Sequence, residues 1–151
     1  MFKKIVVGTD GSPNAEEAIR VAAEVAAGAG ASLHVVAAYR PVGEAELRAI
    51  ARDLPAEFRD LVYQERGADS QLGSARRIVE IAGVDAEFVD VVGDAAEVLL
   101  DVVDETGADL LVVGSRGEGR AGRLLHGSVS TKVLHHAPCT TLVVKDSEQS
   151  G

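Results

Sequence analysis

The sequence predicts an α/β fold, a doubly wound three-layer sandwich in which helices cover both faces of a five-stranded parallel sheet. Short apolar runs rich in β-branched residues alternate with longer segments of helical period, which is the pattern of parallel strands joined by helical crossovers. The runs are apolar along nearly their whole length, as in Leu110–Val113. Such strands suit a sheet that is buried on both faces.

Five segments are predicted as strands because they are short, apolar and bounded by glycine, aspartate or proline. They are Lys3–Thr9, Ser32–Ala38, Ala86–Asp90, Asp109–Val113 and Thr140–Lys145. A chain of 151 residues fits one domain. We expect this domain to span residues 1–146, followed by a short polar tail at 147–151.

Helices are predicted where apolar residues recur every three or four positions. Three of these segments are Pro13–Ala27, Ala95–Thr106 and Ser128–His136. The first is the most clearly bounded, because Ser12 can cap its start and Gly28 and Gly30 can stop it.

The crossover between the second and third predicted strands is the longest. Apolar residues step with helical period from Leu47 to Val62, with an interruption at Pro55. The period resumes over Leu72–Ala82 after a break near Gly67. We therefore expect an extra helix or a broken helix in this part of the chain.

The charge of the chain is strongly negative overall but positive in one segment. The net charge is −9 and aromatic residues make up 3%, so a general nucleic-acid surface, which needs a basic field and stacking rings, is not expected. Residues 114–136 carry a local charge of +3, which leaves −12 for the rest of the chain (−9 minus +3). The charged residues of that segment are Arg116, Arg120, Arg123, Lys132 and Glu118. An anionic ligand therefore has one favoured place to bind.

Cysteine usage and hydropathy predict the compartment. The single cysteine, Cys139, has no internal disulfide partner and no second thiol for a C-x-x-C pair. No apolar run approaches the about 18 residues that a membrane helix needs. The N-terminal apolar stretch reaches Gly8 and Asp10 too soon for a signal peptide. We therefore expect a cytoplasmic protein without membrane attachment.

The stretch most typical of a binding site follows the fourth predicted strand. It reads Gly114-Ser115-Arg116-Gly117, nine further residues, then Gly127-Ser128-Val129-Ser130. Glycines let backbone N–H groups approach phosphate oxygens, and the free N–H groups and dipole at a helix start near Ser128 favour negative charge. This stretch is predicted to form a phosphate-binding loop and helix start.

A second glycine-rich exit, Gly8-Thr9-Asp10-Gly11-Ser12, follows the first predicted strand. In open α/β sheets, ligands bind beyond the carboxyl ends of strands, where the winding direction reverses. The two exits form one site if the first and fourth strands are neighbours, which the residue pattern alone leaves open.

These residues resemble the universal stress protein family. The spacing of Gly114, Gly117, Gly127 and Ser128 is similar to the G-x-x-G, nine residues, G-[ST] motif of its ATP-binding members. The resemblance extends over three further segments, Ile5–Ser12, Ala108–Val113 and Val133–Cys139, and so spans the whole chain.

The resemblance implies a strand order of 3-2-1-4-5 and a nucleotide site at the two exits. Asp10 would face the ribose or a Mg²⁺ or Mn²⁺ ion, and Ala38 would border the adenine. The implied nucleotide-binding residues are Gly8, Thr9, Asp10, Ala38, Gly114, Ser115, Arg116, Gly117, Glu118, Gly119, Arg120, Gly127, Ser128, Val129 and Ser130.

The implied function is regulatory ATP binding. The glycines do not choose between ATP and a second class of ligand, AMP or a cyclic nucleotide, for which the protein would be a second-messenger sink. No residue is assigned as catalytic, because no general base or clamp for an attacking water is assignable, so we expect at most slow ATP hydrolysis. Relatives dimerise through the last strand, which implies a homodimer through Thr140–Lys145, an apolar edge with Lys145 alone to deter pairing.

Other interpretations are weaker. Gly117–Gly122 spells G-x-G-x-x-G, but this dinucleotide motif should open the first βαβ unit and here it follows the fourth strand. Asp10, Asp90 and Lys145 suggest a phosphoacceptor receiver domain, but receivers usually pair two acids at the first of these sites. Neither a Walker motif nor the H-I-G-H or S-G-G-x-D-S loops of adenylating and thiolating enzymes occurs.

The remaining candidate side chains have simpler structural interpretations. Cys139 is expected to be a partly buried residue at a strand start. His135 and His136 lie near a helix C-terminus, where they favour the dipole. His34 is expected to be a core histidine with satisfied hydrogen bonds. His126 is the one histidine with access to the predicted site.

Overall fold

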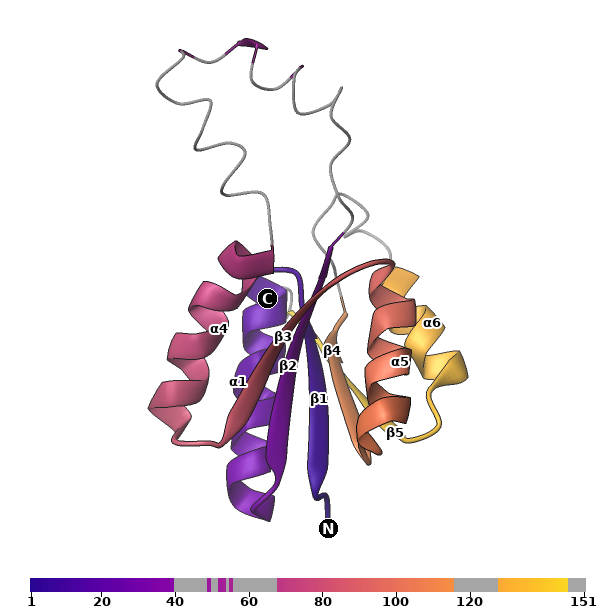
Figure 1. The fold of residues 1–151 in the computed structure, drawn as a ribbon. Coiled ribbons are helices and arrows are strands. Elements are labelled where there is room, and N and C mark those ends of the chain that lie inside the picture. The colour runs from indigo at the N-terminus through magenta and orange to yellow at the C-terminus, as the bar shows by residue number, and fades with distance from the viewer. Residues whose placement is uncertain (40–48, 50–51, 54, 56–67, 116–127, 147–151) are drawn as a thin grey trace.

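One parallel sheet organises the fold (Figure 1). The structure, a computed structural model, describes residues 1–39, 49, 52–53, 55, 68–115 and 128–146. Within these residues the strands are all parallel and lie in the order β3-β2-β1-β4-β5. They are β1 (Lys4–Thr9), β2 (Ser32–Tyr39), β3 (Ala86–Val92), β4 (Leu110–Gly114) and β5 (Thr140–Val144). The predicted fold class and the implied strand order are both confirmed.

Helices cover both faces of the sheet and so make three layers (Figure 1). One face carries α1 (Pro13–Ala29) and α4 (Ala68–Ala82), and the other carries α5 (Ala95–Thr106) and α6 (Ser128–His136). Successive residues of a strand point to opposite faces. Val7 therefore joins the core under α1 and α4, whereas Val6 joins the core under α5 and α6. This double burial is the reason for the continuous hydrophobicity of the strands.

The bounds of α1 follow from its caps. At its start, Ser12 Oγ accepts the N–H of Ala15 at 3.2 Å, as the sequence predicted. Gly28 lies inside the helix, and the helix stops at Gly30, whose φ of 68° is the left-handed conformation of a helix C-cap. The predicted end at Ala27 is therefore too early. Gly28 adopts the helical conformation, and the helix ends only where Gly30 adopts the left-handed one.

Pairing between strands decides where the strands end. Ala38 and Tyr39 of β2 pair with Val91 and Val92 of β3, so β3 continues past its predicted end at Asp90. The other strands differ from their predicted ranges at their ends only. The predicted helices over Ala95–Thr106 and Ser128–His136 have the observed bounds.

Part of the prediction falls on residues whose structure is not described. The helical steps between 47 and 62 lie almost entirely there, as does the tail at 147–151. After the predicted break near Gly67, α4 begins at Ala68, earlier than the predicted Leu72. In the described part of the chain, no helix is both long enough and apolar enough to cross a membrane.

Candidate functional site

The turn after β1 is held by its own side chains. Thr9 Oγ1 accepts the N–H of Gly11 at 3.1 Å, and Asp10 Oδ1 accepts the N–H of Ser12 at 2.9 Å. Gly11 has a φ of 81°, in the left-handed region that favours glycine. Short polar side chains that bond the backbone two residues further on are typical of such turns. The first glycine-rich exit is therefore a shaped turn that leads directly into α1.

The exit of β4 is held by the end of β5. Gly114 pairs with Val144, and the N–H of Ser115 donates to the Val144 carbonyl at 2.9 Å. Ser115 is buried, with 6% of its surface exposed. The chain therefore leaves the sheet at a defined point, within the first two residues of the stretch predicted to hold phosphates.

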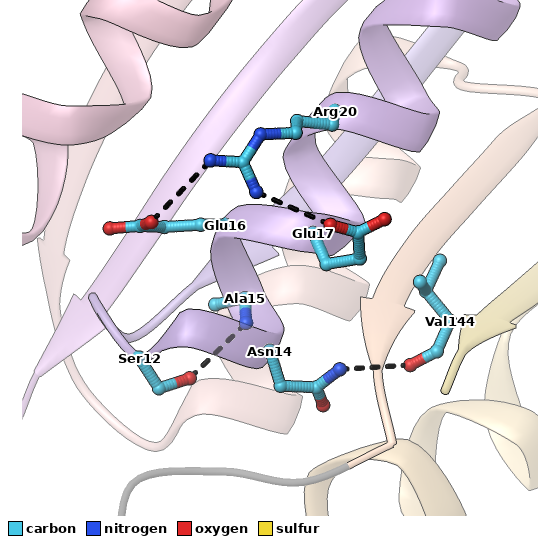
Figure 2. Close-up of polar contacts among 7 residues, drawn as sticks. All are labelled: Ser12, Asn14, Ala15, Glu16, Glu17, Arg20 and Val144. Carbon is cyan, nitrogen blue, oxygen red and sulfur yellow. Dashed lines mark hydrogen bonds and ion pairs between the residues drawn. The ribbon is translucent and has the colours of Figure 1, made fainter. Parts of the chain in front are cut away.

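The two glycine-rich exits lie side by side. β1 pairs directly with β4 in parallel, with Val7 opposite Val112, so the segments that follow the two strands leave the sheet at the same end. Gly114 also lies against the helix that the first exit leads into, because a Cβ on Gly114 would lie 2.6 Å from Oδ1 of Asn14 in the first turn of α1. Figure 2 shows the Asn14 side chain directed at Val144, with 3.2 Å between Nδ2 and the carbonyl oxygen. The juxtaposition that the residue pattern left open is confirmed.

Packing explains the glycines at both strand ends. A Cβ on Gly8 would lie 2.8 Å from Cδ1 of Leu99, a residue of α5 that is 3% exposed. A Cβ on Gly114 would meet the side chain of Asn14, which is 5% exposed. Both positions therefore need glycine for contacts between elements, whatever a ligand also requires.

The helices that start at this edge differ in charge. Ser12 caps α1, and Glu16 lies in its first turn. Asp94 caps α5 by accepting the N–H of Glu97 at 3.2 Å, which places two acidic residues at that helix start. The first turn of α6 contains no acidic residue. Its positive dipole end is therefore better suited to a negative ligand than that of α1 or α5.

The first turn of α6 presents its residues unequally. Ser128 is exposed, Val129 packs partly against the core under α5 and α6, and Ser130 is buried, with 1% exposed. In the next turn, Lys132 Nζ lies 3.8 Å from the carboxylate of Asp94. A ligand at this helix start would therefore meet Ser128 before Ser130.

The end of β2 lies at the same edge. Thr9 of β1 pairs with Ala37, and the next residue, Ala38, is half-buried. The described part of the predicted site, at the ends of β1, β2 and β4 and the start of α6, thus lies along one edge of the sheet. The predicted residues Arg116, Gly117, Glu118, Gly119, Arg120 and Gly127 lie outside the described residues, as do Arg123 and His126.

A metal at this edge would depend on the ligand. Across the residues whose structure is described, no three His, Cys, Asp or Glu side chains come together to hold a metal ion. In nucleotide sites Mg²⁺ is commonly bound by one or two carboxylates together with phosphates and water. The Asp10 carboxylate fits that donor set and does not make a site that protein ligands complete alone.

The receiver-domain interpretation fits the structure poorly. Asp90 lies inside β3, opposite Ala37, and is exposed. β2 lies between β3 and β1, so Asp90, although level with Thr9 in the register, does not lie beside the Asp10 turn. The geometry that suggested a phosphoacceptor site is therefore not formed.

His34 and Cys139 were both predicted to have structural roles only, and the structure bears on each of them. His34 Nε2 lies 3.3 Å from Glu87 Oε2, but its buried Nδ1 has no hydrogen-bond partner in the described structure. The prediction that His34 is fully satisfied is therefore wrong, because Glu87 on the neighbouring strand reaches only one ring nitrogen. Burial, with help from Asp109 and Asp104, raises the pKa of the Cys139 thiol, which favours the unreactive protonated form.

Asn14 also lies at this edge, although the sequence did not predict it as a site residue. It lies on the buried stripe of α1, one helical turn before Ala18 and two before Ala22. A polar residue on an apolar stripe is a usable signal, because a buried amide needs defined hydrogen-bond partners.

Known proteins match this chain along nearly its whole length. The model of the universal stress protein family matches residues 1–145. The chain belongs to the universal stress protein family. A universal stress protein of Mycobacterium tuberculosis is 38% identical over 148 residues, which cover 95% of this chain and 96% of that protein.

Two solved universal stress proteins share this fold and hold ligands. One, in complex with cAMP, is 35% identical with a TM-score of 0.66, and the match covers 95% of this chain and 97% of that one. The other, from Archaeoglobus fulgidus in complex with dAMP, is 25% identical with a TM-score of 0.64, covering 95% and 98%. Both ligands of these universal stress proteins are adenine nucleotides with one phosphate.

Proposed function

We propose that this universal stress protein binds an adenine nucleotide, ATP, and serves as a regulatory protein that reports nucleotide state to partners. The observation that carries the proposal is the pairing of β1 with β4, which sets the two glycine-rich exits side by side, with Gly114 against Asn14 at the start of α1. This arrangement brings the Gly8–Ser12 turn and the β4 exit at Gly114 and Ser115 to one end of the sheet, where ligands of open α/β sheets bind. The cAMP complex of a 35% identical relative supports the same ligand class.

The distribution of charge favours a phosphate at the start of α6. The chain carries a net charge of −9, and α1 and α5 both have acidic residues in their first turns. The first turn of α6 has none, and residues 114–136 carry a local charge of +3. An anion is therefore attracted to this part of the edge and repelled by most of the remaining surface.

The hydrogen bonds at the β4 exit narrow the set of phosphate donors. The Ser115 N–H already donates to Val144, so we expect its hydroxyl rather than its amide to face the ligand. The backbone donors would then come from Arg116–Arg120 and from Gly127–Ser130 at the helix start. Asp10 would face the ribose or a Mg²⁺ or Mn²⁺ ion held with the phosphates, and Ala38 would border the adenine.

A second candidate function is a sink for AMP or a cyclic nucleotide. The relatives solved with cAMP and with dAMP favour it, because both ligands carry a single phosphate. The two functions differ in how many phosphates the loop after Gly114 holds, and therefore in which nucleotide the protein retains when it is purified.

The experiment that tests both functions is direct. Protein purified without added nucleotide is denatured, and the released small molecules are identified by mass spectrometry. Equilibrium dialysis with ATP, AMP and cAMP then ranks the three affinities, with GTP as the control for adenine selectivity. ATP bound most tightly supports the leading function, and tightest binding of AMP or cAMP supports the second. Equal binding of GTP, or no binding of any nucleotide, contradicts both.

Hydrolysis of bound ATP is proposed to be slow or absent. Asp10, the acidic residue of the β1 turn, holds the Ser12 N–H through Oδ1 and is proposed to face the ribose or a metal ion, so it is not assigned as a general base. Phosphoryl transfer depends on a group that positions the attacking water. Phosphate release far faster than one turnover per minute in the presence of Mg²⁺ or Mn²⁺ would contradict this part of the proposal.

We propose a homodimer through β5. This strand is one edge of the sheet, and its Leu142 and the neighbouring α6 residue Leu134 are 36% and 47% exposed. An apolar edge strand tends to pair with another chain unless something covers it. Pairing of two copies through β5 would cover both the strand edge and these side chains.

A further inference from the structure

Asn14 is a buried polar residue at the point where the two glycine-rich exits meet. It lies in the first turn of α1 and is 5% exposed, although Pro13 before it is exposed. Burying an amide side chain is costly unless hydrogen bonds replace those lost from water. Alanine would favour the helix more and would bury no polar group, so an asparagine at this position indicates a specific role for its amide.

The amide nitrogen of Asn14 ties α1 to the ends of two strands. Nδ2 donates to the carbonyl oxygen of Val144 at 3.2 Å, and the same oxygen accepts the N–H of Ser115 at 2.9 Å. A carbonyl oxygen has two lone pairs and can accept both. One acceptor at the end of β5 therefore joins the first turn of α1 to the exit of β4. Figure 2 shows the Asn14 half of this link.

The amide oxygen of Asn14 sets how closely the exits approach. A Cβ on Gly114 would lie 2.6 Å from Oδ1 and 3.0 Å from Cγ of Asn14, so the glycine backbone lies directly against the amide. The backbone oxygen of Asn14 is also close to that position, at 3.3 Å. Asn14 is thus a spacer between the start of α1 and the exit of β4 at Gly114.

We propose that Asn14 is a positioning residue of the nucleotide site, which sets the separation and orientation of the two exits without touching the nucleotide. This inference rests on the proposed adenine-nucleotide function. Loss of the Asn14 amide releases the β4 exit from α1, so the groups on the two exits no longer converge on one ligand. Affinity then falls by more than the loss of stability alone would produce.

The test compares a substitution at a buried residue beside the proposed site with a substitution at a buried residue far from it. Asn14→Ala removes the contacts of the amide with Val144 and Gly114. Val103→Ala is the control, because Val103 is 1% exposed in the core under α5. It lies near the C-terminal end of that helix, at the end of the sheet where the strands begin and far from the proposed site. Both variants are measured well below their unfolding midpoints, with ATP and with AMP. Asn14→Ala is expected to bind at least about tenfold more weakly than the unsubstituted chain, and Val103→Ala to bind equally well.

A second pair of variants tests the spacing itself. Gly114→Ala forces a Cβ against Oδ1 of Asn14 and is expected to weaken nucleotide binding in the unsubstituted background. In the Asn14→Ala background the obstructing amide is gone, so the added cost of Gly114→Ala should be much smaller. Additive losses would show that the two residues act independently and would overturn the inference.

The outcomes separate the inference from the function on which it rests. If the unsubstituted chain binds and Asn14→Ala binds equally well, the positioning role of Asn14 fails and the nucleotide function stands. If the unsubstituted chain binds no adenine nucleotide, the proposed function fails and the inference fails with it. A tenfold loss shared by Val103→Ala would reduce Asn14 to a contributor to stability and would also overturn the proposal.

Discussion

The carboxylate of Asp109 receives the N–H of Lys3 on both of its oxygens, at 3.1 Å and 2.9 Å. It also accepts the N–H of Lys4 at 3.1 Å, so it holds the start of β1 beside the start of β4. Desolvation acts to raise the pKa of Asp109 and is the largest single influence. The hydrogen bonds from the backbone of Lys3, Lys4 and Asp109 itself together outweigh it and lower the pKa below its usual value.

This lowered pKa predicts a loss of stability in acid. A carboxyl whose pKa is lower in the folded than in the unfolded protein stabilises the fold above the unfolded pKa, and this contribution disappears as the pH falls through the folded value. Below about pH 4 the Asp109 contribution should therefore be lost progressively. Urea unfolding of the unsubstituted chain and of Asp109→Asn should differ at neutral pH and converge in acid. A constant difference across that range would contradict the prediction, and Asp101→Asn on the exposed face of α5 is the control.

The cap of α5 should contribute measurably to stability. Asp94 accepts the N–H of Glu97 and lies 3.8 Å from Lys132, so Asp94→Ala leaves a helix-start donor unpaired. Loss of an N-cap side chain typically costs about 1 kcal/mol of unfolding free energy. Denaturant unfolding followed by circular dichroism measures it. Asp101→Ala, an exposed substitution inside the same helix, should stay within about 0.5 kcal/mol of the unsubstituted chain.

Two glycine substitutions should change stability in opposite directions. Gly8→Ala places a Cβ 2.8 Å from Cδ1 of the buried Leu99 and should destabilise the fold by about 1–3 kcal/mol. Gly73→Ala, inside α4, meets nothing within 4 Å and should stabilise it by about 0.5–1 kcal/mol. Thermal unfolding of the two variants gives the comparison. Equal shifts of the same sign would show that contact with Leu99 does not restrict position 8.

The glycines of the predicted loop should be required for nucleotide binding. Substitution of Gly114 and Gly127 together by valine should abolish ATP binding, because the added side chains obstruct the approach of backbone donors to the phosphates. Gly127→Val alone separates this effect from the contact of Gly114 with Asn14. Gly28→Ala, which meets nothing within 4 Å in α1, is the matched control. Undiminished ATP affinity in the folded double variant would contradict the proposed site.

The proposed dimer should depend on β5. Leu142→Lys places a charge on that edge strand, and we expect the mass in solution to fall from twice to once the 15.7 kDa of the chain. Light scattering coupled to size-exclusion chromatography measures this mass. Val92→Lys on the opposite edge strand β3, where Val92 is 54% exposed, should leave the dimer intact. A dimer that survives Leu142→Lys but not Val92→Lys would place the interface on β3.

The spacing of apolar residues along the sequence predicted most of the strands and helices. Apolar period distinguishes strands from helices, because each helix must bury one stripe and each central strand both faces. The predicted Ala95–Thr106 helix has the observed bounds, with Asp94 as its cap and Gly107 as its left-handed end. Where prediction failed, at Ala27 and at Asp90, the deciding contact lay beyond the local sequence or depended on a backbone conformation.

For the site, sequence determined the residue types, and tertiary structure decided which of them meet. The Gly114–Ser130 stretch and the Gly8–Ser12 turn were recognisable from spacing, because glycines and a helix start are local requirements of a phosphate loop. Their adjacency depends on the pairing of β1 with β4. This pairing is made by backbone hydrogen bonds, which are the same for every side chain, so the order of the strands cannot be read from the pattern of side chains. For the same reason sequence spacing did not indicate that Asn14 contacts Gly114, a hundred positions away, or that one carbonyl at Val144 holds both exits in place.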